Sequence, residues 1–257
     1  MIRYLVLLIL ASCGAAFSAG LYDFNGTISC RTLEAYLSRA LVMSAVCCDA
    51  EGVPSPCADD DIRAIANVKA KFIGRAAIAG SCPADDELHF KTAREMAEKI
   101  HAQDPEIILQ AGILEAVFSC RSPEAVKAGR KTGVENIPVP AWAFEAFGLQ
   151  PENRGFDYEA MLFPDGSYRD MWGPGASVPD ITRQETRLWY YYRARRYIDA
   201  GYEAIHFGQA DLVGRTDTGR KAWTELLSMV REYARARARR RYVLCDAHFS
   251  AENAKTG

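Results

Sequence analysis

Five apolar runs in the chain stop at a side chain that can bind a polar ligand or take part in a reaction. These runs are residues 20–26, 71–78, 106–115, 202–211 and 241–249. Stretches with helical periodicity separate most of them, which predicts alternating strands and helices around a parallel sheet. Because ligands bind over the carboxyl ends of the strands in such folds, we expect a single site at that end of the sheet.

A TIM-type (β/α)n barrel is the architecture that this alternation favours. The sequence contains six strand candidates, whereas a closed (β/α)8 barrel has eight. We therefore expect an α/β barrel that is incomplete or C-terminally truncated. The segment 20–26 is its first predicted strand, and apolar spacing from Leu33 to Met43 predicts a helix after it.

The domain organisation follows from length and composition. A chain of 257 residues with 49% hydrophobic side chains can bury one sizeable core, which predicts a single domain over 20–257. Residues 121–181 are rich in proline, glycine and aromatic side chains. Such a long irregular stretch in a compact domain is usually functional, so we expect this insert to form the rim of the site.

The first 19 residues predict an export signal, because an early arginine precedes an apolar core too short for a stable membrane anchor. The segment Leu-Ala-Ser-Cys that ends at Cys13 resembles the lipobox of bacterial lipoproteins. This resemblance implies a lipid anchor on Cys13 and a periplasmic or cell-surface location. Cleavage near Ser18 or Ala19, followed by plain secretion, is the alternative.

Export changes how the cysteines are interpreted, since disulfides persist in an oxidising compartment. Besides Cys13, the chain has Cys30, Cys47, Cys48, Cys57, Cys82, Cys120 and Cys245. This odd number leaves at least one thiol free, and Cys245 in an apolar run is the candidate for a buried one. Cys82 could pair with Cys120, and Cys57 could pair with Cys47 or Cys48. No Cys/His array has metal-ligand spacing, so no zinc site is predicted.

Charge and motifs exclude several classes of function. A formal net charge of -2 argues against a role dominated by nucleic-acid phosphates. The arginine-rich stretch 231–241 is interpreted as the solvated end of a helix. The sequence has no phosphate-binding loop, dinucleotide fingerprint or GxSxG elbow, so we predict no cofactor.

The whole pattern is similar to the (β/α)8-barrel glycoside hydrolases. An exported chain with Asp, Glu, Gln and His at strand ends and loops rich in Trp and Tyr carries this resemblance, most clearly in YIDAGYEAIHFGQ, residues 197–209. It covers residues 20–249 in architecture only, and no motif identifies a family. The resemblance implies a carbohydrate ligand and a hydrolytic reaction. The missing last barrel units put in doubt any catalytic residue carried there, so none is transferred.

Carboxylates at the strand ends are the catalytic candidates, because glycoside hydrolysis needs two carboxyl groups flanking the bond. Glu115 is the candidate general acid, since it follows an apolar run and would be partly desolvated. Its candidate partners are Asp246, Asp211 and Asp23. Each of them could instead cap a helix or pair with an arginine such as Arg75.

Substrate-binding candidates stand at strand ends and in the irregular insert. They are Arg75, Gln209, His248, Trp142 and Trp172. The polar members could bind hydroxyl groups, and the two tryptophans could stack on the apolar faces of sugars. Core packing is the alternative interpretation of both tryptophans.

The pair Asp246 and His248 can serve more than one function, because alternation along a strand points both side chains to one face. The pair could orient a hydroxyl, act as a base, or ligate a metal together with Glu115 and Asp23. A purely structural pair is equally compatible with the sequence. His206 lies within an apolar run and is interpreted as a core histidine.

Three functions are compatible with these residues. An exported glycoside hydrolase is favoured. A metal-dependent sugar isomerase or lyase using Glu115, Asp246 and His248 is the first alternative. A non-catalytic, glycan-binding surface lipoprotein is the second, which the polar segment after the last predicted strand favours because it is too short for a further helix.

Overall fold

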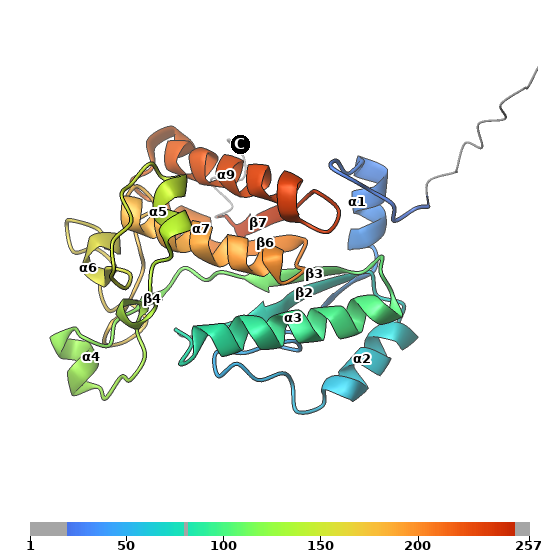
Figure 1. Ribbon diagram of the computed structural model, residues 1–257, viewed down its shortest axis with the longest axis horizontal. Helices are drawn as coiled ribbons and strands as arrows, with labels where there is room; N and C mark the ends of the chain where they lie inside the picture. The colour runs from blue at the N-terminus through green and yellow to red at the C-terminus, as the bar shows by residue number, and fades with distance from the viewer. Residues whose placement is uncertain (1–19, 80–81, 250–257) are drawn as a thin grey trace, which may run out of the picture.

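A five-stranded parallel sheet forms the centre of the protein (Figure 1). The structure is a computed structural model, and it describes residues 20–79 and 82–249. The strand order is β1-β2-β3-β6-β7. The strands are β1 Ala40–Val42, β2 Phe72–Ile78, β3 Ile108–Gly112, β6 Ala204–Gln209 and β7 Leu244–His248. Sheet strands therefore pair in chain order, and β1 and β7 form the two edges.

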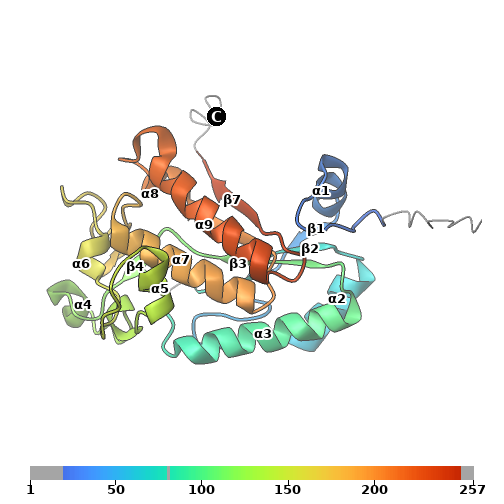
Figure 2. The same cartoon turned by 45° about the horizontal axis from the view of Figure 1, so that its top comes forward.

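Long helices cover one face of this sheet. They are α2 Ala58–Asn67, α3 Asp86–Gln103, α7 Gln184–Asp199 and α9 Lys221–Arg237. Figure 2 shows α7 and α9 packed side by side over the strands. Strand side chains such as Ile73, Leu109 and Ile205 are fully buried in the core beneath the helices. The main hydrophobic core therefore lies between this face and the helices.

The opposite face is covered only in part. Tyr36 of α1 Cys30–Leu37 packs there on Phe72, Ile108 and Ala204, in a second and smaller apolar cluster. These strand residues lie toward the amino ends of β2, β3 and β6. Because side chains alternate along a strand, the next positions on the same face are polar in β3, β6 and β7. The carboxyl-terminal half of this face therefore carries polar side chains outside the apolar cluster.

The segment between β3 and α7 is a compact insert at one end of the molecule (Figure 1). Its elements are β4 Val117–Phe118, α4 Pro123–Lys127, η1 Val134–Asn136, α5 Ala141–Ala146, α6 Tyr158–Met161 and β5 Ala176–Ser177. Strands β4 and β5 pair only with each other, antiparallel. Two short elements, α8 Ala210–Val213 and η2 Thr218–Arg220, lie between β6 and α9.

The predicted TIM-type barrel is wrong, because the sheet stays open. Residues 20–26 form turns rather than a first strand. The helix expected as far as Met43 ends at Leu37, and β1 follows it as a short edge strand. The insert adds no strand to the parallel sheet. The fold is therefore α/β with an open, five-stranded half-barrel.

All seven cysteines among the described residues are free thiols, so neither proposed disulfide is formed in the structure. Burial raises the pKa of Cys47, Cys48, Cys82 and Cys245 to about 12. These thiols therefore stay protonated at neutral pH and pack as small apolar groups.

The predicted export signal and Cys13 lie outside the described residues. Among residues 20–79 and 82–249, no helix has the length and apolar character needed to cross a membrane.

Candidate functional site

Polar side chains from four strands meet on the uncovered half of the sheet. They are Arg75 of β2, Gln110 of β3, His206 of β6, and Asp246 and His248 of β7. Hydrogen bonds join all five, and we call this set the polar face. It lies toward the carboxyl ends of the strands, where parallel sheets bind ligands.

Gln110 organises the polar face although its side chain is almost fully buried. Its Nε2 donates to Asp246 Oδ1 at 2.8 Å, and its Oε1 accepts the Arg75 backbone N–H at 3.1 Å. The first bond crosses β6, whose Ala204 is the register partner of Gln110 and has a side chain small enough to leave the path open. One amide thus links β2, β3 and β7.

Two imidazoles bracket the Arg75 guanidinium. Arg75 Nη2 lies 3.5 Å from His206 Nε2 and 3.3 Å from His248 Nε2. A guanidinium can only donate, so both ring nitrogens accept. His206 must then carry its proton on Nδ1, which donates to Asp246 Oδ1 at 3.3 Å. The geometry therefore favours one tautomer of His206, whose side chain is only 4% exposed.

Arg75 sits in a backbone conformation that is unusual for a strand. Its φ is 56°, in the left-handed region, and the pairing of β2 with β3 shifts register between Ile73 and Ala77. A non-glycine residue in this region is strained, and the surrounding structure must hold it there. The bond from the Arg75 N–H to Gln110 is one such restraint.

Glu115 and Gln209 form a second polar pair beside the polar face. Glu115 Oε1 accepts from Gln209 Nε2 at 2.7 Å, and Oε2 accepts from the Gln209 N–H at 3.2 Å. Gln209 is the register partner of His248, which places this pair next to β7. Both carboxylate oxygens accept hydrogen bonds from the end of β6, so the geometry suits a clamp on that strand better than a proton donor.

Gly208 makes this clamp possible, and we expect Gly208→Ala to destabilise the protein by about 2 kcal/mol. Its φ is +59°, and a Cβ there would lie 2.2 Å from Glu115 Oε2. Gly166 has φ +75° with no atom within 4 Å of a built Cβ, so Gly166→Ala should cost only the conformational strain, about 1 kcal/mol. Urea unfolding measures both variants, and equal losses would contradict the clamp.

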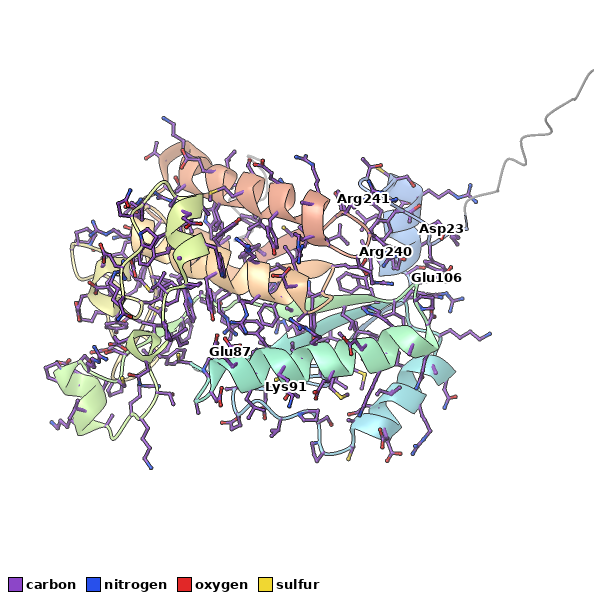
Figure 3. The ribbon with its side chains drawn as sticks, in the orientation of Figure 1. Asp23, Glu87, Lys91, Glu106, Arg240 and Arg241 are labelled. Carbon is purple, nitrogen blue, oxygen red and sulfur yellow. The ribbon has the colours of Figure 1, made fainter. Side chains whose placement is uncertain are left out.

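Asp23 lies at the other end of the sheet from the polar face. Its carboxylate accepts the Gly20 N–H at 2.6 Å. Figure 3 places it near Glu106 and Arg240, which precede β3 and β7. The structure therefore separates Asp23 from Glu115 and Asp246, because the segment that carries it does not form a strand.

The remaining candidates are carried by α8 and by the insert. Asp211 is in the first turn of α8, directly after β6. Trp142 stacks on Tyr192 of α7, with ring centroids 5.7 Å apart, and so packs on a helix of the covered side. Trp172 is 45% exposed in the insert. Of the predicted residues, the structure joins Arg75, Asp246 and His248 directly and places Gln209 and Glu115 beside them.

Two residues of the polar face were not candidates in the sequence. Gln110 interrupts the apolar run IILQAGIL. The interpretation of His206 as a core histidine is confirmed in that its side chain is buried, but its ring lies on the face of the sheet that carries Arg75 and Asp246. A polar side chain at an alternating position of an otherwise buried strand was the available signal for both. It could not distinguish a satisfied core group from a group on an uncovered face.

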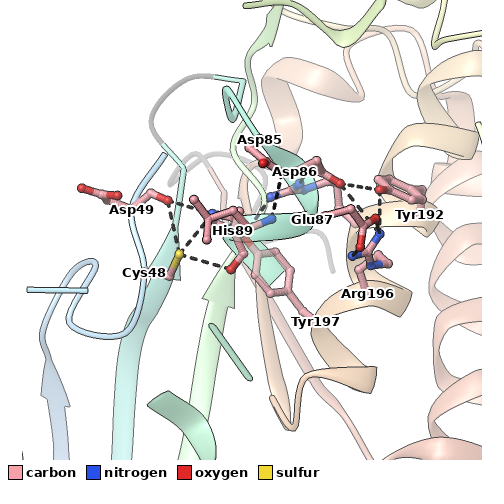
Figure 4. Close-up of polar contacts among 11 residues, drawn as sticks. Cys48, Asp49, Asp85, Asp86, Glu87, His89, Tyr192, Arg196 and Tyr197 are labelled. Atoms are coloured by element: carbon pink, nitrogen blue, oxygen red, sulfur yellow. Dashed lines mark hydrogen bonds and ion pairs between the residues drawn. The ribbon is translucent and has the colours of Figure 1, made fainter. Parts of the chain in front are cut away.

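A separate polar network ties α3 to α7 (Figure 4). Asp86 binds Arg193, and Arg193 Nη2 donates to Tyr197 Oη at 3.1 Å. Tyr197 donates to His89 Nε2 at 2.8 Å, and His89 Nδ1 donates to the Asp49 carbonyl at 2.7 Å. Burial, with the nearby Arg193 charge, lowers the pKa of His89 to about 3. The groups are buried and mutually satisfied, which indicates a structural role.

The described ranges contain no group of three or more His, Cys, Asp or Glu side chains arranged to hold a metal ion. No protein-family model matches the chain, and no curated protein matches it in sequence. The geometry of the polar face is therefore the basis for a functional proposal.

Proposed function

We propose that this protein is an exported carbohydrate-binding protein whose ligand lies on the polar face. The observation that carries the proposal is the single hydrogen-bonded set on a sheet face that the helices leave uncovered. Sugar hydroxyls both donate and accept, and this set presents the exposed Asp246 and His248 and the half-buried Arg75, while the buried Gln110 and His206 hold them in place. A lipid anchor on Cys13 belongs to the same proposal and would hold the site at the membrane surface.

Binding of a carbohydrate requires fewer precisely placed groups than its hydrolysis does. Hydrolysis by the usual route needs two carboxyl groups on either side of the bond. Glu115 has both oxygens engaged by Gln209, and Asp23 lies at the far end of the sheet. Within the polar face, Asp246 is the one carboxylate, and its side chain is 59% exposed. The arrangement therefore supports recognition of hydroxyl groups most directly.

Glycoside hydrolysis is the second candidate, and the pair of His206 with Asp246 favours it. A carboxylate that holds an imidazole in one tautomer is a typical arrangement for a general base. A metal-dependent isomerase has less support, because Glu115, Asp246 and His248 are not among any metal-binding group in the described part of the chain.

We expect Asp246→Ala to weaken glycan binding about 10- to 100-fold, since a hydrogen bond to a charged group contributes about 1.5–3 kcal/mol. Isothermal titration calorimetry against glycans selected on an array measures the change. Asp165→Ala is the matched control, because Asp165 lies in the insert, is 58% exposed and pairs with Arg215. Equal affinities of both variants would place the ligand elsewhere.

The same glycans distinguish a carbohydrate-binding protein from an enzyme that hydrolyses carbohydrates. Release of reducing ends by the wild type, lost in Asp246→Ala but retained in Asp165→Ala, would replace the binding proposal by hydrolysis. A wild-type protein that neither binds nor cleaves any glycan would refute both candidates.

A further inference from the structure

We infer that the ligand carries an anionic group, a carboxylate or a sulfate, and that Arg75 binds it. This inference rests on the proposed function and deepens it, because it specifies an acidic carbohydrate. Three observations on Arg75 support it: its charge, its backbone and its position relative to Asp246.

The charge of Arg75 has no carboxylate partner among the described residues. Its guanidinium hydrogen-bonds only to His206 and His248, and both contacts use the same nitrogen, Nη2. Several other partly or fully buried arginines pair with carboxylates, for example Arg154 with Glu185, Arg193 with Asp86, and Arg240 with Glu203. Arg187, by contrast, donates to backbone carbonyl groups. A guanidinium fork matches a carboxylate or sulfate through two parallel N–H bonds. Arg75 retains this capacity on the open side of the sheet.

The backbone of Arg75 is kept in a costly conformation. The left-handed region is sterically unfavourable for a non-glycine residue, and glycine would occupy it without this cost. Strain of this kind persists at sites where a side chain must be held in a particular place. Here the bulge in β2 directs the guanidinium across β3 to the imidazoles of β6 and β7.

The imidazole of His206 separates the positive and negative ends of the polar face. Its Nε2 faces Arg75 and its Nδ1 faces Asp246, at opposite edges of one ring. Asp246 is further engaged by Gln110 through Oδ1. An anionic substituent can therefore contact Arg75 and His248 while hydroxyls of the same sugar reach Asp246. Repulsion from the carboxylate is reduced because the ring lies between the two charges.

The test compares neutral, uronate and sulfated oligosaccharides with the same backbone and length, on an array and then by calorimetry. We expect at least tenfold tighter binding of one acidic form than of the neutral form, in keeping with a charge-assisted hydrogen bond pair. The form that shows the preference identifies the anion. Arg75→Gln should abolish the preference for the acidic form over the neutral form, whereas Arg63→Gln, at an exposed position of α2, should leave that preference unchanged.

The outcomes separate this inference from the proposed function. Binding of neutral and acidic forms with equal affinity would overturn the inference and leave carbohydrate binding in place. An acidic preference that survives in Arg75→Gln would also overturn it. No binding of any form by the wild type would instead sink the proposed function.

Arg75→Gly provides a further test, because a purely structural role of Arg75 predicts a different thermal unfolding midpoint for this variant. We expect the thermal unfolding midpoint to rise by about 2–4 °C, because glycine relieves the left-handed strain, while the acidic preference is lost. An Arg75 that serves only to tie the strands together would give a lower midpoint in this variant. That result would overturn the inference.

Discussion

Asp86→Asn should lower the free energy of unfolding by about 3–5 kcal/mol, the usual effect of removing one partner of a buried ion pair. Asp86 and Arg193 are 9% and 4% exposed, and Tyr192 also donates to the same carboxylate. Without this carboxylate, the Arg193 guanidinium stays between aromatic rings of Phe90 and Trp189 with its charge uncompensated. The site on the sheet is not touched by the change, so the loss reports on the contact between α3 and α7.

Urea unfolding of Asp86→Asn and of a matched surface variant tests this expectation. Asp60 and Arg63 form an exposed pair on α2, with side chains 67% and 69% exposed. Asp60→Asn should therefore cost less than about 1 kcal/mol. The double variant Asp86→Leu/Arg193→Met should recover much of the loss, because no buried charge remains. A loss below 1 kcal/mol in Asp86→Asn would contradict the buried network.

Acid should destabilise the protein through His89 before most carboxylates are protonated. Burial and the Arg193 charge lower the pKa of His89 from 6.5 to about 3 in the folded protein. The unfolded chain therefore binds a proton that the folded chain excludes. The contribution of His89 is complete above pH 6.5 and declines as the pH falls toward 3, by about 1.4 kcal/mol per pH unit. Between pH 6.5 and 4.5 this amounts to about 2–3 kcal/mol.

His89→Gln isolates this contribution, since an amide can occupy the site without titrating. We expect its free energy of unfolding, measured in urea at several pH values, to decline less steeply than that of the wild type between pH 6.5 and 4.5. His101 provides the comparison, because burial lowers its pKa to about 4 and His101→Gln should remove a similar decline over a narrower range. Parallel curves for wild type and His89→Gln would show that His89 is accessible to protons in the folded state.

The alternation of apolar runs and helical stretches was sufficient to predict the α/β class and four strands of the parallel sheet. Strands β2, β3, β6 and β7 lie within runs that the sequence marks as apolar. Buried parallel strands need near-continuous apolar side chains, so composition alone identifies them. The edge strand β1 has only three residues and one half-buried side chain, and it lacks that signal.

Barrel closure could not be predicted, because it depends on pairing between segments that are distant in the chain. The turns at 20–26 pack on Tyr36 near the amino ends of the strands instead of pairing with a neighbour. This same packing moves Asp23 away from Glu115. Polar residues that follow apolar residues form the same local pattern in a strand and in such a turn. The strand wrongly predicted over 20–26 therefore also led to the wrong placement of Asp23 in the site.

By itself, the sequence determined that strands with polar ends build this protein, and it pointed to Arg75, Asp246 and His248 at those ends. Tertiary structure alone decided that Gln110 and His206 join them, because only the arrangement of the helices shows which face of the sheet is uncovered. Tertiary structure also decided the backbone conformation of Arg75. The left-handed backbone of Arg75 accompanies a register shift between β2 and β3, and register depends on contacts that a one-dimensional pattern does not contain.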